Sequence, residues 1–200
     1  MQTYHSSVAG DIAWFKQCLA DQNLVAALKN IKLVISDVDG TLTDTTVYVD
    51  QAGEGGRTFS VQDGYIVKPA MLAGITITFM SGKDNFSTIQ RARKLGIPED
   101  LCIVGIDTKP MFVAKIQQKL NISIDQTLLI GDDFLDAEVK LQSATKLYAC
   151  PENTPFYLQQ LADIIVPRTG GDGAFRLLMD LVLYVQKKHF AQVLIEKMVA

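Results

Sequence analysis

The fold of this 200-residue chain is decided by the stretch Ile31-Lys32-Leu33-Val34-Ile35-Ser36-Asp37-Val38-Asp39-Gly40-Thr41-Leu42-Thr43-Asp44. A short run of aliphatic and β-branched residues that ends in turn residues predicts a buried strand. Open α/β sheets bind their ligands at the carboxyl ends of such strands. Two acids directly after a buried strand are unfavourable unless they bind something, which disfavours a mere turn or capping role. We therefore interpret Asp37 and Asp39 as functional residues.

Further apolar runs alternate with segments of helical pattern along the rest of the chain. The expected strands are Ile75–Met80, Leu101–Val104, Thr127–Ile130, Lys146–Ala149 and Ile164–Val166. Nearly continuous apolar strands that alternate with helices are typical of a parallel sheet covered on both faces. The sequence thus predicts a Rossmann-like, three-layer α/β fold over residues 31–200.

The segment between the first two strands predicts a β-hairpin flap and no large cap domain. Two β-rich runs, Val47–Asp50 and Arg57–Val61, flank a glycine-rich turn. This hairpin and one helix fill the interval from Asp37 to Ser81, which leaves no room for another domain. The site is therefore expected to be open unless a neighbouring subunit covers it, with the hairpin as the contact between subunits.

Residues 1–30 predict an N-terminal helical extension, packed on the domain or on a partner subunit. Apolar residues recur at helical spacing from Asp11 to Asn30, whereas residues 1–10 are polar and expected to be poorly ordered. A net charge of −3 gives no reason to expect nucleic-acid or membrane binding, and no apolar run has the length of a membrane span. Three cysteines without paired spacing and the lack of a signal-peptide pattern predict a cytoplasmic protein.

Polar residues follow the expected strands at the points where they end. In chain order they are Asp37 and Asp39, then Ser81, then Lys109, then Asp132, Asp133 and Asp136. Parallel strand ends share one edge of the sheet, so these side chains should converge. Oxygen ligands without nearby His or Cys favour Mg²⁺, and an ammonium group offsets the charge of a transferring phosphoryl group. Taken singly, Ser81 also suits a helix cap, Lys109 a solvated lysine and the later acids a turn.

The four motifs Asp37-Val38-Asp39-Gly40-Thr41, Ser81, Lys109 and Gly131-Asp132-Asp133-Phe134-Leu135-Asp136 resemble those of haloacid dehalogenase superfamily phosphatases, over about residues 31–180. The resemblance implies that Asp37 is the nucleophile that forms an aspartyl-phosphate and that Asp39 is the general acid and base. It implies that Ser81 and Lys109 hold phosphoryl oxygens. Mg²⁺ would be held by the Asp37 carboxylate, the Asp39 backbone carbonyl and Asp132. The supporting or substrate-contacting residues would be Thr41, Asp63, Gly82, Lys83, Asp133, Asp136 and Arg168.

The hairpin, Phe59–Gly64 and the glycine-rich Arg168–Arg176 resemble a capless subgroup that includes 3-deoxy-D-manno-octulosonate 8-phosphate (KDO 8-phosphate) phosphatase. The resemblance implies a homotetramer with a central barrel of hairpins and a phosphorylated eight- or nine-carbon sugar acid as substrate, KDO 8-phosphate first. The glycine-rich segment either reaches an adjacent site or is a loop before the last helix.

Three departures from the subgroup's pattern leave the sugar acid open. Lys83 stands where arginine is usual, which loses the planar grip on a carboxylate, and Thr45 and Ile66 stand where glycine is common. A nine-carbon nonulosonate 9-phosphate is the alternative substrate. Phosphoacceptor receiver domains gather similar side chains, but their acid pair precedes the phosphoacceptor, whereas here the presumed nucleophile comes first.

Overall fold

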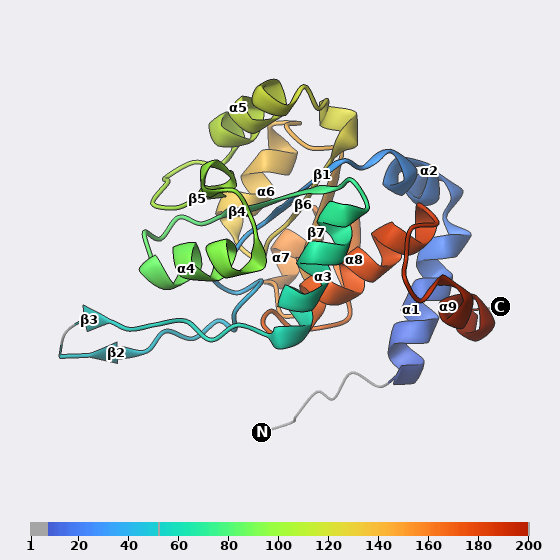
Figure 1. Ribbon diagram of the computed structural model, residues 1–200, viewed down its shortest axis with the longest axis horizontal. Coiled ribbons are helices and arrows are strands. Elements are labelled where there is room, and N and C mark those ends of the chain that lie inside the picture. The colour runs from blue at the N-terminus through green and yellow to red at the C-terminus, as the bar shows by residue number, and fades with distance from the viewer. Residues whose placement is uncertain (1–7, 52, 200) are drawn as a thin grey trace.

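Six parallel strands form the centre of the computed structural model, which describes residues 8–51 and 53–199. The strand order is β5-β4-β1-β6-β7-β8, so β1 lies in the interior of the sheet between β4 and β6 (Figure 1). The strands are β1 Leu33–Ser36, β4 Thr76–Met80, β5 Cys102–Ile103, β6 Thr127–Ile130, β7 Leu147–Pro151 and β8 Ile164–Val166. The predicted three-layer α/β fold is confirmed.

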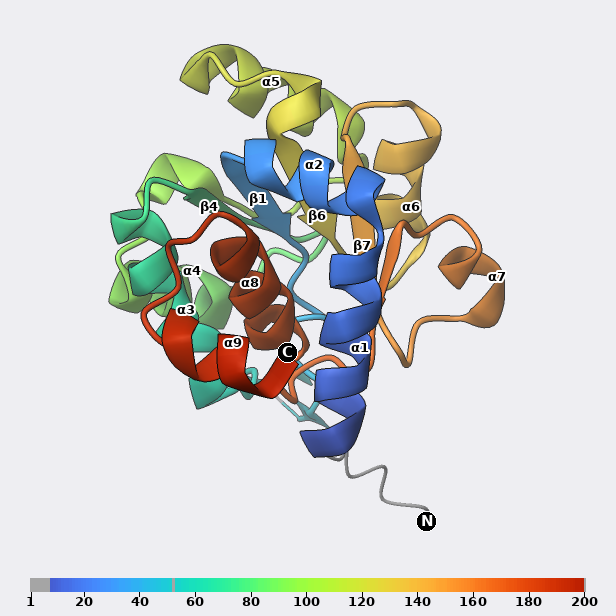
Figure 2. The same ribbon diagram turned by 90° about the vertical axis from the view of Figure 1, so that its right-hand side faces the viewer.

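Helices cover both faces of the sheet (Figures 1 and 2). On one face α3 packs against α8 and α4, and on the other α5 packs against α6. The helices are α1 Val8–Ala20, α2 Gln22–Asn30, α3 Val61–Leu72, α4 Phe86–Leu95, α5 Pro110–Leu120, α6 Phe134–Leu141, α7 Phe156–Gln159, α8 Ala174–Val185 and α9 Gln192–Val199, with short 3₁₀ turns at Glu99–Leu101 and Ile124–Gln126. None of the described helices is long and apolar enough to cross a membrane.

The hairpin after β1 is present but shorter than predicted. It consists of β2 Val49–Asp50 and β3 Gly53–Glu54, paired antiparallel, and it extends away from the sheet (Figure 1). The expected second strand, Arg57–Val61, was wrong. The second strand is Gly53–Glu54, residues 57–60 form no strand, and helix α3 begins at Val61. Ser60 Oγ accepts a hydrogen bond from the Asp63 backbone N–H at 3.4 Å, which caps that helix. No cap domain lies between β1 and β4 in the described residues.

The N-terminal segment forms two helices that pack on the same chain. Asp21 separates them and caps α2, since its carboxylate accepts hydrogen bonds from the backbone N–H groups of Asn23 and Leu24. Helix α1 contacts α8 and α9, and the Trp14 indole N–H donates to the Ile165 carbonyl of β8 at 2.8 Å. Residues 1–7 lie outside the described residues, but residues 8–10, expected to be poorly ordered, belong to α1. A domain boundary near residue 30 stays a prediction.

Caps and turns set two further helix boundaries. Asp133 caps α6, which begins at Phe134. Helix α8 ends at Val185, where Lys187 follows in the left-handed region (φ 56°), and the separate helix α9 comes after it.

Candidate active site

The carboxyl ends of the central strands surround a cavity of about 350 Å³. Nine of the residues singled out from the sequence line it: Asp37, Asp39, Ser81, Gly82, Lys83, Lys109, Asp132, Asp133 and Asp136. They come from the ends of β1, β4 and β6 and from the start of α5. Ile106, Asp107 and Leu135 complete the lining. The topology thus brings together side chains that are up to about a hundred positions apart in sequence, as expected of an open parallel sheet.

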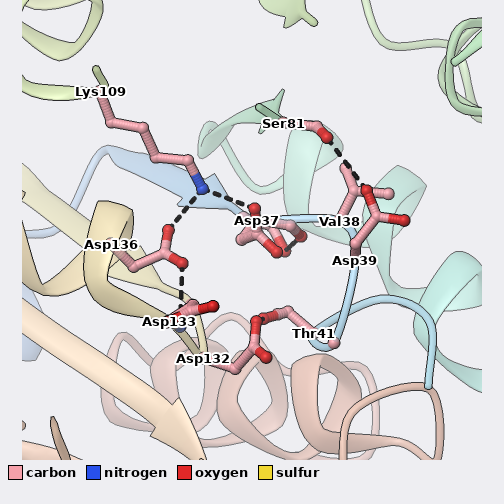
Figure 3. A network of polar contacts seen from close by, with 12 residues as sticks. Asp37, Val38, Asp39, Thr41, Ser81, Lys109, Asp132, Asp133 and Asp136 are labelled. Carbon is pink, nitrogen blue, oxygen red and sulfur yellow. Dashed lines mark hydrogen bonds and ion pairs between the residues drawn. The ribbon is translucent and has the colours of Figure 1, made fainter. Parts of the chain in front are cut away.

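Lys109 lies between the carboxylates of Asp37 and Asp136 (Figure 3) and lines the cavity. Its Nζ is 2.5 Å from Asp37 Oδ1 and 2.6 Å from Asp136 Oδ1, and the lysine is 1% exposed. Burial alone would lower the pKa of Lys109, but the carboxylates of Asp136 and Asp37 raise it above its ordinary value. Lys109 is therefore a fixed cation and not a solvated lysine.

Asp37, Asp132 and Asp136 form a compact group of carboxylates. One oxygen from each lies within 4.8 Å of the others. Burial raises the pKa of Asp37 well above its usual range, and the neighbouring carboxylates add to this effect while Lys109 opposes it. Burial and the charges of Asp136 and Asp133 raise the pKa of Asp132 to about 7. Carboxylates crowded in this way favour either protons or a hard divalent cation, so the donor set fits Mg²⁺.

Asp136 serves the fold and the cavity at once. Its Oδ2 accepts a hydrogen bond from the Asp133 backbone N–H, while Asp133 Oδ1 accepts one from the Phe134 N–H at 2.7 Å. These bonds cap the N-terminus of α6 and hold Asp136 against Lys109 (Figure 3). Both oxygens of Asp136 thus accept hydrogen bonds from the protein.

Asp39 points away from the Asp37–Lys109 pair and towards Ser81 (Figure 3). Ser81 Oγ donates to Asp39 Oδ2 at 3.2 Å and accepts from the Lys83 backbone N–H at 3.0 Å. The other oxygen of Asp39 accepts a hydrogen bond from Arg57 Nε. The Arg57 side chain is buried, whereas that of Asp39 is about a third exposed to the cavity.

Gly40 allows the loop after β1 to approach Asp132. Its backbone is in the left-handed region (φ 89°), and a Cβ there would lie 2.1 Å from Asp132 Oδ2. Thr41 follows, and its hydroxyl donates to Asp132 Oδ1 at 3.3 Å (Figure 3). A side chain at position 40 would therefore separate the two acidic loops. The Gly-Thr pair keeps Asp132 within reach of Asp37.

The structure places three of the predicted residues outside the cavity lining: Thr41, which contacts Asp132, and Asp63 and Arg168, which lie further away. The Asp63 carboxylate accepts hydrogen bonds from the backbone N–H groups of Gly173 (3.3 Å) and Arg176 (2.8 Å) at the start of α8, and burial raises its pKa to about 6. Arg168 forms a two-bond ion pair with Asp11 of α1, with the shorter contact at 2.5 Å. Asp63 thus joins two helices, and Arg168 joins the N-terminal helix to the glycine-rich segment.

The glycine-rich segment packs against the loop after β1 of its own chain. The Gly171 backbone N–H donates to the Thr41 carbonyl at 3.0 Å. A Cβ on Gly170 would lie 1.8 Å from the Gly40 carbonyl oxygen, so only glycine fits at that point. In this structure the segment is a loop before α8 that supports residues 40–44.

Sequence reasoning missed Arg57 and Asp107. Arg57 contacts the presumed acid and base, yet it was assigned to a hairpin strand by its β-rich neighbours. The available signal was that Arg57 is the single basic residue between Lys32 and Lys68 in the sequence. Asp107 lies in the loop between β5 and Lys109, and its position next to a motif was the corresponding signal.

Comparison with known proteins identifies close relatives, although no protein-family model matches the chain. The chain is 34% identical over 161 residues to the 3-deoxy-D-manno-octulosonate 8-phosphate phosphatase KdsC of Haemophilus influenzae, which covers 80% of this chain and 87% of that protein. It is 30% identical over 166 residues to KdsC of Escherichia coli K12, covering 83% of this chain and 86% of that protein.

The solved structures that resemble this chain include phosphatases of the same kind as these relatives. The cobalt-bound phosphatase of Haemophilus influenzae superposes with a TM-score of 0.76 at 34% identity, over 80% of this chain and 92% of that chain. The structure of a putative KDO 8-phosphate phosphatase from Vibrio cholerae superposes with a TM-score of 0.78 at 36% identity. The match covers 84% of this chain and 91% of that chain. The Moraxella catarrhalis phosphatase in complex with magnesium, phosphate and KDO superposes with a TM-score of 0.78 at 27% identity. The match covers 90% of this chain and 99% of that chain.

Proposed function

Because this chain belongs to the KdsC family of phosphatases within the haloacid dehalogenase superfamily, we propose that it hydrolyses KDO 8-phosphate to KDO and phosphate. The convergence of Asp37, Lys109 and Asp132 in one cavity at the end of β1 is the observation that carries this proposal. The relatives are named as phosphatases of KDO 8-phosphate, and the Moraxella catarrhalis structure is a complex with magnesium, phosphate and KDO.

Asp37 and Asp132 would hold Mg²⁺, with the backbone carbonyl of Asp39 as a further ligand. Both Asp136 oxygens already accept hydrogen bonds, from Lys109 and from the Asp133 N–H, which favours the other two carboxylates as direct ligands. When bound, the ion would neutralise charge on the phosphoryl oxygens and keep the buried Asp37 ionised. Mg²⁺ dependence belongs to the proposal.

Asp37 would act as the nucleophile. Its carboxylate attacks phosphorus in line with the leaving oxygen of the sugar, and an aspartyl-phosphate forms on Asp37 as that P–O bond breaks. Lys109 holds Asp37 in place and offsets the charge on the phosphoryl group. The Ser81 hydroxyl, directed into the cavity by the Lys83 N–H, would donate to a phosphoryl oxygen. These groups position the substrate and require no movement of the strands.

Asp39 would transfer the proton in both steps. It protonates the leaving alkoxide of the sugar and then accepts a proton from the water that hydrolyses the aspartyl-phosphate. Proton transfer matters most for an alkyl phosphate, because a sugar alkoxide is a poor leaving group. The loss of Asp39 should therefore be less severe for an aryl phosphate.

The identity of the sugar acid is a finer part of the proposal. Lys83 lines the cavity and is exposed, so its ammonium can meet the anionic part of a substrate beyond the phosphate. Lysine does not offer the bidentate geometry of arginine to a carboxylate. This position leaves the sugar acid open, and a nine-carbon nonulosonate 9-phosphate is the alternative substrate.

We also propose that the hairpin mediates assembly into a homotetramer. Val47, Tyr48 and Val49 lie together before or within β2, and each side chain is about half to two-thirds exposed. A contiguous apolar strip on a projecting hairpin favours contact with another copy. Sedimentation should show the oligomer, and a fully active monomer would contradict this part of the proposal.

Phosphate release from KDO 8-phosphate and from nonulosonate 9-phosphates, measured side by side with Mg²⁺, tests the function. KDO 8-phosphate should give the higher kcat/KM. Asp37→Asn should abolish turnover of every substrate while circular dichroism shows an intact fold. Turnover retained by Asp37→Asn would refute the nucleophile, whereas preference for a nine-carbon substrate would refute only the sugar assignment.

A further inference from the structure

We propose that Arg57 is a positioning residue for the carboxylate of Asp39, an inference that rests on the proposed function. Arg57 Nε donates to Asp39 Oδ1, and the Arg57 side chain is only 1% exposed. Ser81 Oγ donates a hydrogen bond to the other oxygen of Asp39, Oδ2, at 3.2 Å. A buried guanidinium and a hydroxyl therefore hold the two oxygens of the presumed acid and base from different elements.

These two contacts differ in what a bound phosphate does to them. The Ser81 hydroxyl has one proton to donate, and that proton is needed by a phosphoryl oxygen once substrate is bound. Its bond to Asp39 Oδ2 must then break, which turns this oxygen towards the substrate. The Arg57 contact does not compete with the phosphate, so it is the one that persists during the reaction.

Because Oδ1 of Asp39 stays bound to Arg57, the proton of Asp39 is carried by Oδ2. With Asp39 protonated, Oδ1 is the carbonyl oxygen that accepts from Arg57, and Oδ2 holds the proton. That proton moves to the leaving oxygen as the P–O bond of the substrate breaks and the bond between Asp37 and phosphorus forms. In the second step water attacks phosphorus, its proton moves to Oδ2, and the bond to Asp37 breaks. Arg57 keeps its protons throughout, because a guanidinium is not deprotonated in proteins.

Arg57 also connects Asp39 to the base of the hairpin. It lies in the segment between β3 and α3, and its Nη1 contacts the Gly55 carbonyl at 3.4 Å. The orientation of Asp39 thus depends on how the hairpin base is held. Lysine could keep the charge but not the planar set of donors that fits Asp39 and the Gly55 carbonyl together.

Arg57→Met and Arg57→Lys, assayed on KDO 8-phosphate and on p-nitrophenyl phosphate, test the inference. A positioning role predicts that Arg57→Met lowers kcat on the alkyl phosphate by about 10²-fold, the scale of general acid–base catalysis, with KM nearly unchanged. In single-turnover measurements of aspartyl-phosphate formation, the loss on p-nitrophenyl phosphate should be under about threefold, because nitrophenolate leaves without a proton and the second step, which both substrates share, is not observed. Arg57→Lys should restore part of the alkyl activity.

The matched control is Arg176→Met. Arg176 is also ion-paired to a carboxylate, that of Asp180, but it does not line the cavity. This variant should leave the ratio of alkyl to aryl turnover unchanged. Urea unfolding of each variant measures the stability change, and Arg57→Gln, which keeps a donor, replaces Arg57→Met if the latter does not fold.

A double variant separates positioning from other roles. If Arg57 acts through Asp39, Arg57→Met should have no further effect on kcat in the Asp39→Asn background. Equal losses in the rate of aspartyl-phosphate formation from both substrates, additive losses in the double variant or a wild-type kcat for Arg57→Met would each overturn the inference. A wild-type protein that releases phosphate from neither compound would instead overturn the proposed function.

Discussion

Replacing Lys109 with methionine should destabilise the protein strongly, because it removes the cation between Asp37 and Asp136 and keeps an unbranched side chain. The Nζ contacts of 2.5 and 2.6 Å are buried. Breaking one side of a buried ion pair leaves uncompensated charge, so the free energy of unfolding should fall by about 3–5 kcal/mol. For a chain of this size that corresponds to a decrease in Tm of roughly 6–20 °C.

The size of this loss should depend on pH. Burial already raises the pKa of Asp37 well above its usual range. Burial and nearby carboxylates together raise the pKa of Asp132 to about 7. A carboxylate with a raised pKa binds more protons in the folded than in the unfolded state, so stability falls as pH rises through that interval. Without Lys109, which opposes this effect, the pKa of Asp37 rises further, and the interval extends upwards. The variant should therefore lose little stability near about pH 5 and most of it by about pH 8.

Urea unfolding followed by circular dichroism, without divalent cations and at both pH values, measures the difference. Lys119→Met is the matched control, since Lys119 forms an ion pair with Asp100 in which both side chains are at least half exposed. No measurable change is expected from it. If Lys109→Met lost the same stability at both pH values, the loss would come from packing and the electrostatic reasoning would be refuted.

Gly170→Ala should lower stability by about 1–3 kcal/mol and reduce kcat, because its Cβ would lie 1.8 Å from the Gly40 carbonyl oxygen. Wild-type Tm and kcat would show that the loop yields easily. The affinity for Mg²⁺, measured by calorimetry, should increase from about pH 6 to about pH 8, because Asp132, with its pKa raised to about 7, must lose its proton to bind the ion. An affinity independent of pH would argue against Asp132 as a ligand. Asp11→Asn should weaken the ion pair with Arg168 and lower the unfolding free energy by about 1 kcal/mol with kcat unchanged. A large loss of kcat would instead mean that α1 positions the catalytic loop.

The sheet and the residues at its edge were predictable from local patterns. Apolar runs of strand length bury both faces, and such runs are visible in sequence at β1, β4 and β6. Because parallel strands end at one edge, the convergence of Asp37, Lys109 and Asp132 follows from strand order alone. The second strand of the hairpin was predicted less well, since Ser60 acts as a helix cap within a segment that also suits a strand.

The sequence alone therefore determined the α/β fold, the edge that holds the site and the carboxylates that enter it, because strand periodicity and strand-end chemistry are local properties. Only the tertiary structure decided that Arg57 holds Asp39, that Asp11 pairs with Arg168 and that Gly170 supports the loop at Gly40. These contacts join segments from different parts of the chain. They depend on how helices and loops pack in three dimensions, which residues adjacent in the sequence do not specify.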